Sequence, residues 1–314
     1  MNRLNVYSFH RNIADYRFDN HNTRQLVDEL SKKYIVNRYD LNGSDGFIFN
    51  ELHINHGSIL IFEDDTTKKF KVFDFGDSPY LVQGLKNHPK FTRAILGQYN
   101  PHLWKDNTKV LPGIYPETMW DFGNLNYETV IDYRAANTLN SKLYWRGSLY
   151  NDPNAGYGAY LGVRTAVELL PDLLGNNFFY GSYPIDFSSY IQEALNYKIV
   201  LSIGGGGGAV CGDICFRDVE MFGLGIPLLR PRYVIEMQDP LIPDTHYISV
   251  DVDFDDLFKY SNHKLLAQQI AGRYNEVIND IEFLNYVSGN AREWYCRNVA
   301  PPSITGKIIT LLEL

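Results

Sequence analysis

The residues best suited to chemistry lie around a run of five glycines at residues 204–208. The run follows an apolar segment and precedes a short helical segment, 215–223, whose first turn contains Arg217. Glycines such as Gly206 and Gly207 let a backbone approach a ligand closely. N–H groups at a helix N-terminus favour an anion, and an arginine offers phosphate a bidentate fork. This combination predicts a phosphate-binding loop.

Two other interpretations of the same residues stay open. The glycine run can be slack in a loop that binds nothing. Arg217 and Glu220 lie three positions apart and can pair on the surface of the helix. An arginine at the start of a helix that directly follows a strand and a bare backbone favours the phosphate-binding interpretation.

The familiar glycine and cysteine motifs do not fit. A nucleoside-triphosphatase loop needs Lys-Ser or Lys-Thr after its glycines, and neither pair follows here. A dinucleotide fingerprint is expected early in its domain, whereas this run comes late. Cys211 and Cys215 have no second Cys/His pair nearby to complete a zinc site. We therefore expect no NAD, FAD or metal cofactor.

Strand and helix signals alternate along the chain. In the first half, strands are predicted at 4–9, 58–63 and 69–75, and an amphipathic helix at 22–34. In the second half, strands are predicted at 141–147, 177–182, 198–204, 226–231 and 245–251, and helices at 160–174, 187–197 and 215–223. This alternation predicts an α/β fold with parallel sheets, arranged as two Rossmann-like domains that face a cleft.

Composition excludes several classes of protein. The 314 residues are 45% hydrophobic and 14% aromatic, which is too apolar for a disordered chain. The net charge of −8 and the absence of a Lys/Arg block argue against a nucleic-acid partner. No apolar run is long enough to span a membrane, and the first residues do not resemble a signal peptide. Three cysteines cannot all pair with one another, so a cytoplasmic location is expected.

Four segments resemble motifs of one family, in that family's order. They are GDSPY (76–80), GIYPETMWDF (113–122), KLYWRGS (142–148), and CFRDVEMFGLGIPLL (215–229) followed by THYISVD (245–251). The chain thus resembles GT-B glycosyltransferases, and among them the capsule-associated and protein O-glucosyltransferase family. It departs from that family at Leu149, where an arginine is usual, and at Ser249, where a proline is usual. It also lacks the secretory signal and cysteine framework of the animal members.

The resemblance implies transfer of a sugar from a nucleotide sugar, expected to be UDP-linked, with inversion and without a metal. Charge that develops on the leaving diphosphate must then be met by cationic side chains and helix N–H groups. Arg217 is the first such group, and Arg146 and Arg164 are the next. The expected donor site therefore consists of Arg146, Gly147, Arg164, Gly206, Gly207, Arg217 and Glu220, with Glu220 placed to hold the ribose. The acidic run 63–65 is expected to be a turn and not a metal site.

Inversion by direct displacement needs a base that takes the proton of the acceptor hydroxyl. The candidates on the amino-terminal side are Asp77, Asp74, Glu117, Asp121 and His10. Asp77 ranks first because it follows a strand inside a family-like segment, although a turn-forming role is an equal alternative. His10 ends the first strand, where a structural imidazole is the competing interpretation.

The expected organisation is an acceptor-side domain at 1–140, a nucleotide-sugar-binding domain at 141–300, and a terminal helix at 301–314. The resemblance implies that this helix returns to the first domain. The acceptor can be a glycan, a protein or a small molecule. Two rival functions stay open: a non-catalytic sugar- or nucleotide-binding protein of the same fold, and an enzyme of another kind, such as an epimerase or phosphorylase.

Overall fold

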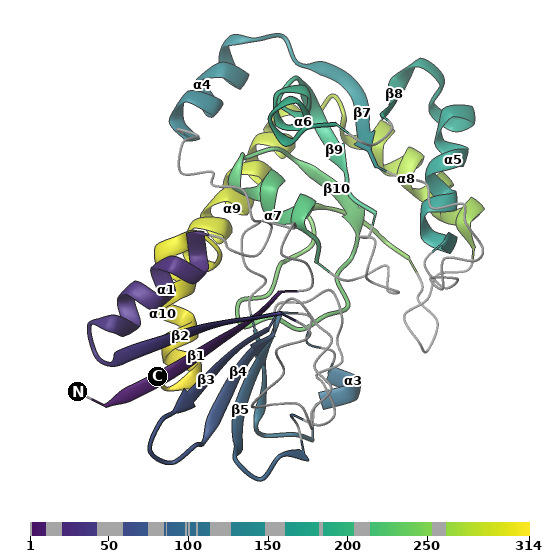
Figure 1. Cartoon of the computed structure of the whole chain (residues 1–314). Helices are drawn as coiled ribbons and strands as arrows, with labels where there is room; N and C mark the ends of the chain where they lie inside the picture. Colours follow the sequence, from purple (N-terminus) through teal and green to yellow (C-terminus); the bar gives the residue numbers. More distant parts are fainter. Residues whose placement is uncertain are drawn as a thin grey trace. The chain divides into compact units, whose positions relative to one another are not determined.

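The chain forms two compact units, each built around one sheet (Figure 1). The computed structural model describes residues 2–10, 21–42, 59–74, 85, 87–97, 99, 101–104, 106–113, 127–147, 161–181, 185–203, 214–252 and 262–314. The first unit comprises Met1–Phe122, Ile235–Pro240 and Arg297–Leu314. The second unit comprises Gly123–Val234 and Leu241–Cys296.

The first unit contains a six-stranded sheet of order β2-β1-β3-β4-β5-β6. Its strands are β1 (Arg3–His10), β2 (Ile35–Asn42), β3 (Ile59–Asp64), β4 (Phe70–Asp74), β5 (Phe91–Leu96) and β6 (Val110–Pro112). Helix α1 (His21–Ser31) lies between β1 and β2 in the chain, and α3 (Pro101–Trp104) lies between β5 and β6. The crossover through α1 brings β2 parallel to β1.

The prediction of a parallel sheet holds for only part of this first sheet. Strand pairs β1–β2, β4–β5 and β5–β6 are parallel, but β3 runs antiparallel to both β1 and β4. A parallel crossover needs a dozen or more residues, and only residues 65–69 connect β3 to β4. Asp64 closes this connection as a tight turn, since its carboxylate accepts the N–H groups of Thr66 at 3.2 Å and Thr67 at 2.6 Å. The acidic run 63–65 therefore leads into a hairpin turn, as the sequence indicated.

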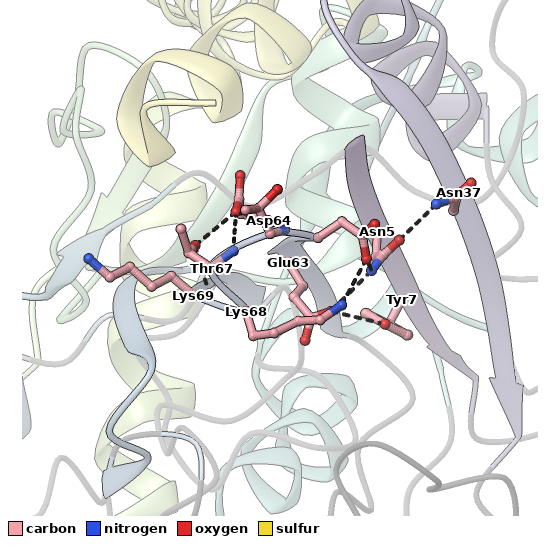
Figure 2. A network of polar contacts seen from close by, with 10 residues as sticks. Asn5, Tyr7, Asn37, Glu63, Asp64, Thr67, Lys68 and Lys69 are labelled. Carbon is pink, nitrogen blue, oxygen red and sulfur yellow. Dashed lines mark hydrogen bonds and ion pairs between the residues drawn. The ribbon is translucent and has the colours of Figure 1, made fainter. Parts of the chain in front are cut away.

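Glu63, the first residue of that run, does not belong to the turn's solvated surface. Its side chain is buried, and its Oε1 accepts hydrogen bonds from Asn5 Nδ2 at 3.0 Å and Tyr7 Oη at 3.4 Å. Lys68, in the hairpin, lies 3.4 Å from the same oxygen, and Asn37 on β2 donates to Asn5 (Figure 2). This network ties β1, β2 and the β3–β4 hairpin together.

The last helix, α10 (Pro301–Leu312), belongs to the first unit and packs on α1, β4 and β5 (Figure 1). Two cations fix its end: Lys71 Nζ donates to the Glu313 carbonyl at 2.7 Å, and Arg93 Nη1 donates to the Leu311 carbonyl at 3.0 Å. Positive charge at a helix carboxyl end offsets the partial negative charge of the last carbonyl groups.

The second unit contains a five-stranded parallel sheet of order β11-β10-β9-β7-β8. Its strands are β7 (Asn140–Arg146), β8 (Phe178–Gly181), β9 (Tyr197–Leu201), β10 (Leu228–Pro231) and β11 (Ile248–Val250). Its helices are α4 (Tyr127–Ala136), α5 (Leu161–Leu174), α6 (Phe187–Ala194), α7 (Phe216–Gly223), α8 (His263–Val277) and α9 (Ile281–Asn298), with a 3₁₀ turn η4 (Gly175–Asn177). The parallel sheet predicted for this half is confirmed.

Helix α4 lies in the second unit because Arg134 fastens it there. The guanidinium donates to the main-chain oxygens of Leu195 at 3.0 Å and Tyr197 at 2.9 Å, between α6 and β9. Tyr144 and Trp145 of β7 are almost fully buried, so these aromatic side chains are core residues, as is usual for aromatics in a strand.

Candidate functional site

The strand order of the second sheet identifies where a ligand is expected. Counted from β7, the order is 2-1-3-4-5, which reverses direction between β7 and β9. In open α/β sheets, ligands bind outside the carboxyl ends of the strands at such a switch point. Residue 203, the last described residue before the glycine run, follows β9 at this edge. The run itself, with Gly206 and Gly207, lies outside the described residues.

Arg217, in the first turn of α7, reaches the carboxyl end of β7. Its Nη2 donates to the main-chain oxygen of Arg146, and its Nε donates to Tyr190 Oη at 3.2 Å. The guanidinium also lies 5.9 Å from the centre of the Trp145 ring. Side chains from α6 and α7 and the main chain of β7 therefore meet at the switch point.

The charge of Arg217 has no carboxylate in contact among the residues that the structure describes, although Arg146 and Arg230 each have one. Burial opposes this charge, but neighbouring groups outweigh the effect, and the pKa of Arg217 lies above its ordinary value. Burial also raises the pKa of the Tyr190 hydroxyl, which stays protonated. A half-buried cation held by neutral groups is a suitable site for an anionic ligand.

The surface ion pair between Arg217 and Glu220, considered from the sequence, is not among the ion pairs of the described residues. Glu220 is 6% exposed, so it is not on the solvent-exposed face of the helix. Its charge acts on Arg217 at longer range.

Arg146 differs from Arg217 because its guanidinium is already paired. Its Nε and Nη2 donate to the two carboxylate oxygens of Glu193 at 2.7 and 3.1 Å, and Tyr144 Oη donates to the same carboxylate at 2.8 Å. A Cβ at Gly181 would lie 2.5 Å from the Arg146 Cζ atom. The side chain of Arg146 therefore joins β7, β8 and α6, while its main-chain oxygen holds Arg217.

Gly147 and Arg164 occupy different surroundings. A Cβ at Gly147 would lie 2.7 Å from the Trp145 ring, and the Gly147 N–H donates to the Gly181 carbonyl at 3.1 Å. Only glycine fits this position without movement of the indole. Arg164 is half-buried near the start of α5.

A buried network that the sequence did not indicate connects the residues on either side of segment 204–213, which contains the glycine run. The Asp218 carboxylate accepts hydrogen bonds from Ser202 Oγ at 2.5 Å and from the Cys215 N–H at 3.0 Å, and it pairs with Arg230. The side chains of Asp218 and Arg230 are both fully buried. Arg230 also stacks on the Tyr233 ring at 3.6 Å from its centre. These contacts connect Ser202 and Cys215, on the two sides of this segment, to Arg230 on β10.

The candidate bases all belong to the first unit. His10 ends β1 and Asp74 ends β4, and both strands point the same way because β3 is antiparallel to each. Ile59 of β3 pairs with Phe9 on one side and with Asp74 on the other, so these strand ends share one edge of the sheet. Asp74 is 5% exposed. Asp77, Glu117, Asp121 and the side chain of His10 lie outside the described residues.

The described residues contain no group of three or more His, Cys, Asp or Glu side chains arranged to hold a metal ion. Among the described helices, none has the length and apolar character needed to cross a membrane.

Comparison with known proteins identifies a distant likeness. No protein-family model and no curated protein matches the chain. The crystal structure of TarM is similar to this chain, with a TM-score of 0.43 and 12% sequence identity. The match covers 73% of this chain and 45% of the TarM chain, so it spans less than half of that protein. A likeness this distant identifies neither the family nor the activity.

Proposed function

We propose that this protein is a glycosyltransferase that moves a sugar from a nucleoside diphosphate sugar, with UDP as the expected nucleotide, to a hydroxyl group of an acceptor. The observation that carries the proposal is Arg217, a half-buried cation at the switch point of a parallel sheet with no contacting carboxylate among the described residues. A diphosphate bound there would receive charge-assisted hydrogen bonds in the ground state, and stronger ones as the leaving group gains charge.

The proposed division of labour assigns the donor to the second unit, which includes most of residues 141–300, and the acceptor to the first unit, which includes residues 1–122 and 301–314. Arg217, the loop glycines Gly206 and Gly207, and the amino-terminal N–H groups of α7 contact the diphosphate. Arg146 and Gly147 form the framework behind Arg217. Glu220 holds the ribose, and Arg164 is a further cation on the donor side.

The proposed base is Asp77, with His10 and Asp74 as the next candidates. A base within reach of the acceptor hydroxyl contributes about 10²–10⁴ in rate. Asp77→Asn should therefore lower sugar transfer by about two orders of magnitude or more while leaving UDP affinity nearly unchanged. Transfer at the wild-type rate would move the role of base to His10 or Asp74.

The first experiment measures UDP binding by calorimetry, and nucleoside diphosphate release from a panel of sugar nucleotides, with the full chain. Arg217→Ala should weaken UDP binding about ten- to hundredfold and slow release, because each hydrogen bond to a charged group contributes about 1.5–3 kcal/mol. Arg217→Lys should restore little, because a point charge cannot reproduce the guanidinium fork. Tyr190→Phe, which removes one hydrogen bond to Arg217, should weaken UDP binding about two- to tenfold.

Arg273→Ala is the matched control, since Arg273 forms ion pairs with Asp244 and Glu276 elsewhere in the second unit. UDP affinity that is the same in Arg217→Ala and in this control would contradict the proposal. Tight UDP binding with no release from any sugar nucleotide, and no transfer, would favour the non-catalytic binding protein.

A further inference from the structure

The first unit contains a groove that shares no residue with the proposed donor site. It has a volume of about 570 Å³ and is lined by Gln238, Asp239, Arg297, Ser303, Gly306, Lys307, Thr310 and Leu311. These residues belong to the segment 235–240, the end of α9, and α10. Small-molecule sites occupy about 300–1,000 Å³, so the groove is large enough for a small ligand.

A fully buried amide fixes the central cation of the groove. Asn298 is 1% exposed, and its Oδ1 accepts a hydrogen bond from Lys307 Nζ. Its Nδ2 donates to Asp239 Oδ2 at 2.7 Å, which sets the orientation of the amide. Because Asn298 is neutral and accepts one hydrogen bond from Lys307, the ammonium group keeps donors for a ligand and has no contacting carboxylate among the described residues.

The charges that line the groove favour an anion. Arg297 and Lys307 carry two positive charges, and Asp239 carries one negative charge. Asp239 already accepts from Asn298 and lies 3.5 Å from Arg297 Nη2. Burial lowers the pKa of Lys307. The positive charge of Arg297 lowers it further, and the negative charge of Asp239 acts in the opposite direction. A bound anion would stabilise the charged form of Lys307 by pairing with its ammonium group.

The surface of α10 forms one wall of the groove. Ser303, Lys307 and Thr310 line the same groove at spacings of four and three residues, which places them on one face of the helix. Gly306 lies beside them, and a Cβ added there would meet no atom within 4 Å. A larger side chain at Gly306 would enter the groove and not the protein core.

We propose that this groove binds the phosphate group of a small phosphorylated molecule. The several oxygens of a phosphate group can accept hydrogen bonds from an ammonium and from a guanidinium at the same time, and these are the two cations of the groove. All of the lining residues lie in the first unit, so the site does not depend on Arg217 or on the proposed transferase activity.

The test uses the full chain and follows binding of inorganic phosphate and of glycerol phosphate by calorimetry and thermal shift, with sodium chloride at equal ionic strength as the reference. Lys307→Gln should weaken phosphate binding by about tenfold or more, because it removes a charge-assisted hydrogen bond. Gly306→Leu should weaken it equally by filling the groove, and should not lower stability without ligand, because leucine favours a helix more than glycine does.

Matched controls are Lys264→Gln, an exposed lysine on α8, and Gly289→Leu, an exposed helical glycine whose Cβ would also meet no atom within 4 Å. Both should bind phosphate as the wild type does. The proposal is overturned if phosphate stabilises the protein no more than chloride, or if Gly306→Leu and Lys307→Gln retain wild-type affinity. It is also overturned if Arg217→Ala abolishes phosphate binding, which would assign the phosphate to the switch point. Tighter binding of glycerol phosphate than of inorganic phosphate would identify a phosphate monoester as the ligand.

Discussion

Replacing Asp218 tests what holds the residues on either side of segment 204–213 in place. This carboxylate is fully buried and interacts with three residues: Ser202 through Oγ, Cys215 through its N–H and Sγ, and Arg230 through its guanidinium. Asp218→Ala removes all of these interactions at once. It leaves Arg230 fully buried without the charge that compensates it, and it leaves the Cys215 N–H without its side-chain acceptor.

The expected cost follows from the unpaired arginine. Removing one partner of a buried ion pair costs about 3–5 kcal/mol, because the remaining charge is desolvated without compensation. Loss of the capping interaction at Cys215 is smaller, about 0.5–2 kcal/mol, and is not simply additive with the cost of the unpaired charge. We therefore expect Asp218→Ala to lower the free energy of unfolding by about 3–5 kcal/mol. Replacing both residues, Asp218→Ala with Arg230→Met, should be less destabilising than Asp218→Ala alone, because no charge is left buried.

Urea unfolding followed by tryptophan fluorescence measures this difference, since Trp145 and Trp294 are both buried in the second unit. UDP affinity, measured at a temperature where the variant is folded, reports on the loop itself and should fall as its anchor is lost. A loss of stability below about 1 kcal/mol for Asp218→Ala, or a double variant less stable than the single one, would refute the reasoning from a buried and uncompensated charge.

Two further predictions concern residues of the second unit. Desolvation, assisted by the charge of Asp218, raises the pKa of the half-buried Cys215 thiol to about 12. Cys215 should therefore stay protonated and resist iodoacetamide at pH 8, while the exposed Cys296 reacts. Peptide mass spectrometry distinguishes the two, and rapid modification of Cys215 in the folded protein would contradict the raised pKa. Gly147→Ala places a methyl group 2.7 Å from the Trp145 ring and should lower the free energy of unfolding by about 1–3 kcal/mol. Gly289→Ala, in open space on α9, should be neutral or stabilising. Equal melting temperatures for the two variants would show that the indole moves aside without cost.

The sequence predicted most of the second unit because local signals determine it. An apolar run and a helical segment with an early arginine correspond to β9 and α7, and the helix does begin one residue before Arg217, whereas the glycine run between them lies outside the described residues. The parallel arrangement followed from the alternation of strands and helices. These features depend on residues that are neighbours in the chain.

The sequence could not predict contacts between distant residues. Nothing near Arg146 indicates that Glu193, on α6, takes its guanidinium, or that Tyr190 and the Arg146 carbonyl hold Arg217. The Asp218–Arg230 pair also depends on the packing of α7 against β10 and has no signature in either segment.

The first unit was harder to predict for a different physical reason. Strand β2 is at the edge of its sheet, and its residues Ile35 and Tyr39 are exposed, so it has no continuous apolar run. The antiparallel direction of β3 relative to β4 follows from the hairpin at residues 65–69, which is too short for a parallel crossover.

The return of α10 to the first unit affects how the protein can fold during synthesis. The ribosome releases residues 1–122 early, yet the surface of β4, β5 and α1 that α10 covers stays without its cover until residues 301–312 have emerged. Domains generally fold as units during translation, in the order in which they are made. Here the unit that begins the chain is completed last, after the whole second unit has left the ribosome. A nascent chain that stalls before residue 301 would therefore present an apolar sheet surface to chaperones and to other nascent chains.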